Sequence, residues 1–274
     1  MPAILLHLLP ATLYTALGVR FWHSRWHAPA LATRPGLRPW ERTLMLVALL
    51  AHGFALHGVF FSPEGIHFGF SLALSLMMWL AMLFYWIESL YARLEGLQTL
   101  SMPLAALCSL LPAFFPDPHL LANAGSPLFR AHFVVAMLAY SLFTLAALHA
   151  VFMGLAERSL HHARLDGRLS RLPPLLAMEA LLFRTIALGF ICLTVALGSG
   201  VVFSEDIFGR PFPFGHKTIF ALLSWLIFAA LLLGRKLRGW RGRIALRWTL
   251  AGFLALLLAY IGSRFVSEVL LGRI

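Results

Sequence analysis

The residues best suited to chemistry in this sequence are histidines that open long apolar segments. His132 lies about one turn inside a segment that begins near Leu128, and His216 is the first residue of another segment. An imidazole at a helix N-terminus feels the positive end of the helix dipole, which favours its neutral form. Neutral imidazole is the form that coordinates metal, and histidine is a common axial ligand of haem iron. The two positions therefore predict a haem-iron site.

A third histidine, His52, competes with these two for the role of ligand. It lies near the middle of the apolar segment 43–61, so a haem bound there would sit closer to the centre of the membrane. His57 lies roughly 7 Å further along the same helix, but it is turned away from His52 by about 140°. The two side chains therefore cannot present one face to a ligand.

Haem propionates need cations close by, and few fall at the ends of the segments where His132 and His216 lie. Arg130, Arg210 and Lys217 are the candidates for this role, and Arg264 lies at the same end. Phenylalanines near these ends are suited to an aromatic slot for the porphyrin: Phe60, Phe61, Phe129, Phe133, Phe203, Phe208, Phe212 and Phe214. One alternative stays open, in which the histidines hydrogen-bond between helices and the phenylalanines face lipid.

The composition indicates which elements must position these side chains. Hydrophobic residues make up 60% of the 274 residues and charged residues only 12%, against about one quarter charged in a soluble domain. Since about 20 apolar residues cross a bilayer as a helix, the sequence predicts an all-α, polytopic membrane helix bundle, one integral domain over 1–274. Eight spans are expected: Ala3–Phe21, Thr43–Phe61, His67–Ile87, Thr99–Phe115, Leu128–Leu155, Thr185–Phe203, His216–Gly234 and Trp248–Phe265.

Lysine and arginine are distributed unevenly between the two ends of these spans. Of the 22 basic residues, 17 fall in the loops after spans one, three, five and seven. Because cytoplasmic loops collect Lys and Arg, both termini are predicted to lie outside. The net charge of +11 then reflects topology and not nucleic-acid binding. We expect a multi-pass protein of the bacterial inner (plasma) membrane, with the lipid bilayer as a partner.

Few other side chains are suited to catalysis. The metalloprotease motif HExxH is absent, and the two cysteines, Cys108 and Cys192, each lie inside an apolar run without a CxxC spacing. A buried cysteine of this kind behaves as a small hydrophobe. Glu205 and Asp206 are neighbouring carboxylates in an outer loop. Such a pair is typical of residues exposed to solvent and not of a catalytic site. The sequence therefore predicts a protein that is not an enzyme.

Several stretches of the chain resemble the cytochrome c assembly proteins, the CcsA/CcmC/HemX-like group of integral membrane proteins. Arg130–Leu148, RAHFVVAMLAYSLFTLAAL, is similar to the H-x(7)-Y segment of that family. The G-x-G at 198–200 and the later HKTIFALLSWLIFAALL are similar to the segments that follow it. Residues 239–243 and 259–264 look like the small YpjD/HemX-type branch, which also has eight spans. The resemblance covers most of the chain and is strongest over 128–265.

In that family the histidine matching His132 is a haem ligand at the outer face, so the resemblance implies the same role here. It also implies a part in cytochrome c maturation or haem homeostasis, with haem and other maturation proteins as partners. The family's tryptophan-rich haem motif is not matched, because this chain has FGRPFPFGHK there and no tryptophan between Trp86 and Trp225. A second outer histidine after the last span is also missing. The resemblance thus implies haem binding, whereas the motif of the haem-transferring members is not matched.

Two other functions remain as alternatives. One is a cofactor-free membrane scaffold or regulatory subunit. The other is a transporter of haem or a small molecule, which would be expected to show Gly- or Pro-broken helices at matching positions of two halves. No such pair is evident in the sequence.

Overall fold

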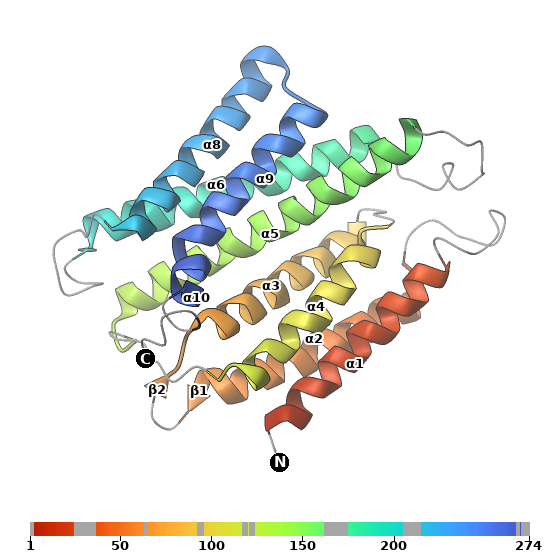
Figure 1. Cartoon of the computed structure of the whole chain (residues 1–274), viewed down its shortest axis with the longest axis vertical. Coiled ribbons are helices and arrows are strands. Elements are labelled where there is room, and N and C mark those ends of the chain that lie inside the picture. Colours follow the sequence, from red (N-terminus) through yellow and green to blue (C-terminus); the bar gives the residue numbers. More distant parts are fainter. Residues whose placement is uncertain are drawn as a thin grey trace.

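The computed structural model describes residues 3–24, 37–62, 65–91, 96–116, 120, 124–161, 175–204, 215–266 and 269. These residues form a helical bundle with one two-residue antiparallel pairing, β1 (Phe61–Ser62) with β2 (Gly65–Ile66) (Figure 1). The helices are α1 (Ala3–Trp22), α2 (Pro39–Phe60), α3 (Phe70–Tyr91), α4 (Gln98–Phe114), α5 (Pro127–His161), α6 (Leu175–Val202), α8 (His216–Arg238), α9 (Arg243–Leu257), η4 (Leu258–Gly262) and α10 (Ser263–Phe265).

The predicted fold class, an all-α polytopic membrane bundle, is confirmed. Each of the eight expected spans coincides with a helix, counting α9 with η4 and α10 as one. Within the described part of the chain, six helices are long and apolar enough by length and composition to cross a membrane, namely α1, α3, α5, α6, α8 and the α9–α10 unit. Helix α4 is shorter at 17 residues, and α2 has 22 residues.

Helices α5, α6 and α9 run furthest beyond the limits that the apolar segments set. Helix α5 continues from the expected Leu155 to His161, and α6 begins at Leu175, ten residues before the expected Thr185. Helix α9 begins at Arg243 instead of Trp248. All three extensions lie on the predicted cytoplasmic side and carry charged residues. Because a helix does not have to stop where its apolar stretch stops, hydropathy locates the buried part of a span better than its ends.

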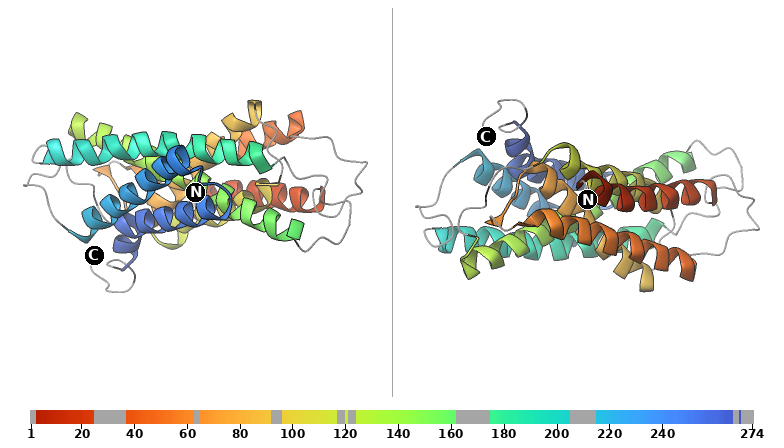
Figure 2. Two further views of the ribbon diagram at one scale, coloured as in Figure 1. Left: turned by 90° about the horizontal axis from the view of Figure 1, so that it is seen from above. Right: turned by 90° about the horizontal axis from the view of Figure 1, so that it is seen from below.

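The helices alternate in direction, so the starts of α1, α3, α5 and α8 lie at one end of the bundle (Figures 1 and 2). The sequence predicts that this end faces outward, and it is called the outer end below. Helix α5 packs against α3, α6 and α9, whereas α1 packs against α2 and α4. Helices α8 and α9 form a hairpin that leans away from the other helices in Figure 1.

The last helix changes form where it reaches the outer end. After α9, residues Leu258–Gly262 form a π-helical turn, η4, and the chain continues as α10. The hydroxyl of Ser263 donates to the carbonyl of Tyr260 at 2.8 Å. A single π-turn inside an α-helix widens it locally and changes the direction in which its side chains point. Tyr260, at the centre of η4, lies among residues of α3, α5 and α8.

Candidate functional site

His132 is held at the outer end of α5 by the neighbouring helix α6. Its Nδ1 lies 2.9 Å from the hydroxyl oxygen of Ser199, whose own hydrogen goes to the carbonyl of Ala196 at 3.0 Å. Because a hydroxyl carries one hydrogen, Ser199 accepts and the Nδ1–H of His132 donates. In the neutral ring the lone pair is then on Nε2, the nitrogen with which an imidazole binds haem iron.

The G-x-G stretch of α6 lets the imidazole come close to the helix backbone. A Cβ added to Gly200 would stand 3.4 Å from Cε1 of His132, so the ring lies against the backbone at this position. A Cβ added to Gly198 would meet nothing within 4 Å. The middle residue of the motif, Ser199, supplies the hydrogen-bond acceptor. Gly200 and Ser199 therefore position the ring, through a close approach and a hydrogen bond respectively.

Beside His132, aromatic rings from three parts of the chain form a cluster. Phe133 contacts Phe68 edge to face with the ring centroids 4.8 Å apart, and it stacks on Phe129 at 6.3 Å. Phe68 also lies 5.8 Å from the ring of Tyr260. Of these four rings, Phe129 and Phe133 were expected from the sequence. The site residues that sequence reasoning missed are Phe68 and Tyr260; Tyr260 lies in a stretch that resembles the family.

Two cations lie over the ring of Tyr260. Lys217 Nζ is 5.6 Å from the ring centroid and Arg264 Cζ is 5.9 Å from it. Both cations were expected at this end from the sequence, and the structure brings them to the same ring. The predicted Arg130 is exposed one turn before Phe133, and its Nε donates to the carbonyl of Ala124 at 2.7 Å.

Not every predicted residue is part of this arrangement. His216 is exposed at the first position of α8, next to Lys217, whereas the hydrogen bond of His132 is to Ser199 of α6. Arg210 lies outside the described residues. The structure therefore places His132 and two of the phenylalanines of the aromatic cluster on α5, and His216 at the same end of the bundle on α8.

His52 lies in a different environment, inside the group formed by α1, α2 and α3. It is fully buried, its Nε2 lies 2.9 Å from the hydroxyl of Ser75, and its ring is 5.8 Å from that of Tyr14 in an edge arrangement. His7 is equally buried and its Nδ1 donates to the carbonyl of Ser109 at 2.8 Å. His52 is thus not one of the outer-end contacts, and His7 joins α1 to α4.

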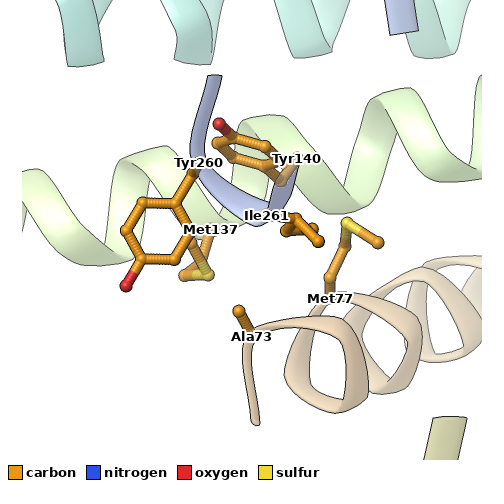
Figure 3. A pocket seen from close by; sticks show the side chains of 6 residues that line it. All are labelled: Ala73, Met77, Met137, Tyr140, Tyr260 and Ile261. Atoms are coloured by element: carbon orange, nitrogen blue, oxygen red, sulfur yellow. The ribbon is translucent and has the colours of Figure 1, made fainter. Parts of the chain in front are cut away.

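A small pocket lies next to Tyr260, on the inner side of the aromatic cluster. Figure 3 shows the side chains that line it, and the hydroxyl groups of its two tyrosines point in different directions. The lining residues are Ala73, Met77, Met137, Tyr140, Tyr260 and Ile261. The pocket has no room for a water molecule, so it cannot hold a porphyrin. A haem at this end would have to lie against the aromatic cluster, outside the pocket.

The donor set at the outer end fits haem. It combines a histidine with a defined tautomer, four aromatic rings at the same end of the bundle and cations for propionates. Among the described residues, no group of three or more histidine, cysteine, aspartate and glutamate side chains could hold a bare metal ion. Haem iron needs only one or two axial ligands from the protein, and histidine is a common one.

Comparisons with known proteins agree with this architecture. A family model described as "Cytochrome C assembly protein" matches residues 40–271. The chain is 27% identical over 160 residues to the inner membrane protein YpjD of Escherichia coli K12, which is 58% of this chain and 60% of that protein. It is 38% identical over 90 residues to the cytochrome c biogenesis protein CcsA of Prochlorococcus marinus NATL1A, which is 33% of this chain and 29% of that protein. No solved structure matches the chain.

Proposed function

The chain belongs to the cytochrome c assembly protein family, and from that premise we propose that it binds haem at the outer end of its helix bundle. The proposed place of action is the inner membrane, where its relative YpjD is named as a resident. The chain spans about 60% of the length of YpjD and less of CcsA. A role in cytochrome c maturation, with other maturation proteins as partners, is therefore part of the proposal.

The observation that carries the proposal is the hydrogen bond between His132 and Ser199. It leaves the lone pair of the neutral imidazole on Nε2, so the ring is prepared for iron without a change of tautomer. Partners that orient a ligating histidine in this way raise its basicity and fix its direction. His132 is therefore the proposed axial ligand, and His216 is the preferred second ligand because it opens α8 at the same end.

The remaining residues would act by binding and positioning. The rings of Phe133, Phe68 and Tyr260 would cover a porphyrin face and exclude water from it. Lys217 and Arg264 lie together over one of these rings, and they would pair with propionates. Arg130 and Arg210 are proposed for the same role. When bound, haem would supply the iron; the chain would supply its ligand, its apolar surroundings and its counter-charges.

The test is a haemin titration of purified protein with single alanine variants at positions 132, 216 and 52. His132→Ala is expected to weaken haemin binding most and to shift the Soret band, because an axial imidazole is lost. His57→Ala is the matched control, since it removes a histidine from the outer half of α2 that has no proposed role. If His132→Ala binds haemin as tightly as the parent and with the same spectrum, the site is wrongly assigned.

The His132–Ser199 bond also favours a second function. It joins α5 to α6 directly, as an interhelical contact in a cofactor-free scaffold or regulatory subunit would. A purified protein without a Soret band, which gains none on haemin titration, would favour this second function over the first.

A further inference from the structure

Away from the outer end, three polar side chains meet inside the bundle. Glu88 comes from α3, His149 from α5 and Thr185 from α6, and they are 6%, 0% and 4% exposed. Glu88 lies three residues before the end of α3, in the half of the bundle opposite to His132. Ionisable side chains inside membrane spans are costly and usually have a function. The proposed haem site uses none of these three residues.

The acid and the imidazole approach each other without a hydrogen bond. His149 Nε2 is 3.8 Å from Glu88 Oε2, which is too long for one. Glu88 Oε2 and both ring nitrogens of His149 are buried and lack hydrogen-bond partners in the described structure. A carboxylate that is buried in this way without donors carries a large desolvation cost. A neutral carboxyl group avoids that cost.

The one hydroxyl beside Glu88 in the described structure gives a carboxylate little compensation. The hydroxyl of Thr185 donates to the carbonyl of Leu181 at 3.0 Å and faces Glu88 Oε1 at 3.5 Å. The longer distance is outside the usual range of an O–H···O hydrogen bond. A carboxylate at Glu88 would therefore be buried with at most one weak donor.

The charged group whose field reaches Glu88 is Arg184, the residue before Thr185. Arg184 is exposed, and its guanidinium lies 5.8 Å above the ring of Tyr91, at the end of α3. Solvent screens a charge in that position. Arg184 and Tyr91 mark the end of the bundle that is closest to the pair. The Glu88 side chain is 9% accessible and that of His149 is 1%, so Glu88 is the member closer to solvent.

We propose that Glu88 and His149 form a proton-binding site inside the membrane, filled from the predicted cytoplasmic side. At neutral pH the proton is on the carboxyl of Glu88, which keeps this buried group uncharged. When the proton leaves the carboxyl oxygen and bonds to Nε2 of His149, a carboxylate and an imidazolium result. Both arrangements hold one proton and have no net charge, so transfer between them adds no net charge to the low-dielectric interior.

Infrared spectroscopy of the purified protein, in H₂O and after transfer to D₂O, tests this site. We expect the carbonyl stretch of a protonated carboxyl group at neutral pH, which shifts in D₂O because the proton exchanges. Glu88→Gln should abolish the band. Glu179→Gln, at a half-buried position of α6 near its start, is the matched control and should leave it unchanged. Thr185→Val should shift the band, because the hydroxyl that faces the carboxyl group at 3.5 Å is lost.

Three results would overturn the proposal. The first is a spectrum without any Glu88-dependent carboxyl band, and the second is a band that does not respond to D₂O. The third is an unchanged band in His149→Phe, which would remove His149 from the pair. If Glu88→Gln does not fold, Glu88→Asp keeps a carboxyl group at this position and should move the band instead of abolishing it.

Discussion

The ring of Phe228 in α8 occupies the space that a side chain at Gly252 in α9 would need. A Cβ on Gly252 would stand 2.8 Å from Cζ of Phe228, closer than real Cβ atoms approach. Phe228 cannot simply move away, because it stacks on Phe143 of α5 with the ring centroids 3.8 Å apart. The hydroxyl of Ser224 also donates to the Gly252 carbonyl at 2.9 Å. The absence of a side chain at Gly252 therefore allows α8, α9 and α5 to pack closely.

We expect Gly252→Ala to destabilise the protein by about 1–3 kcal/mol, the usual cost of overpacking a core. Gly198→Ala is the control, because a Cβ there meets nothing within 4 Å and alanine is the better helix former. Unfolding in detergent, followed by circular dichroism, measures both. Equal stability of the two variants would show that α8 and α9 are not packed as described.

Ser199→Ala should weaken haemin binding by about 10–100-fold, the usual effect of removing a partner that orients a metal ligand. The imidazole of His132 keeps its place but loses the acceptor that fixes its tautomer. Thr194→Val is the control, since it removes an α6 hydroxyl that accepts from Trp225 and not from His132. Unchanged affinity in Ser199→Ala would mean that the hydrogen bond has no part in ligand binding.

Changing Arg130, Arg210 and Lys217 together to Gln should speed haem loss without unfolding the bundle. Adding Arg264→Gln should speed it further, because Lys217 and Arg264 lie over the same tyrosine ring. Haem retention after gel filtration gives the measurement, and circular dichroism reports the fold. Haem content that stays at the parental level in the fourfold variant would exclude all four cations from the site.

His52→Ala should lower stability by about 2–5 kcal/mol, as buried large-to-small substitutions do, and leave haemin affinity unchanged. The ring fills space beside Tyr14, and its Nε2 pairs with Ser75 in a group of helices apart from His132. The same titration as for His132→Ala decides between the two. A larger loss of affinity at position 52 than at 132 would move the haem towards the centre of the membrane.

The orientation of the bundle remains a prediction from the distribution of basic residues. A reporter that is active only outside the cytoplasm should be active after Ile274 and inactive when inserted in the turn at Gly239. That turn follows three basic residues in the last turn of α8, Arg235, Lys236 and Arg238. The opposite pattern of reporter activity would invert the topology and place His132 on the inner side.

The spans, and the position of His132 near the start of one of them, could be predicted from the sequence, because both depend on local signals. Apolar segment length marks a span, and a histidine near the start of one is visible without a fold. The partner of His132 could not be predicted, because Ser199 is 67 residues away and only packing brings it close. Helix ends were predicted less well, since α6 starts ten residues before its apolar stretch.

Contacts between distant helices account for the other differences. Glu88 and His149 are far apart in the sequence, and only the fold places them 3.8 Å apart. Arg264 was expected at the outer end, but its position over Tyr260 depends on the π-turn in the last helix. His216 opens α8 at the same end as His132, and its role as second ligand stays a prediction.

The hydrogen bond between His132 and Ser199 joins two helices that follow one another in the chain, and this has a consequence for biogenesis. Both residues are synthesised before α8 and α9, so the ligand and its orienting partner can assemble while the last two long helices are still being translated. At about 5–20 residues per second, Arg264 follows Ser199 by roughly 3–13 s. During that interval the nascent protein contains the proposed iron ligand without the complete set of Lys217, Tyr260 and Arg264. Haem captured at this stage would be enclosed as the C-terminal hairpin inserts.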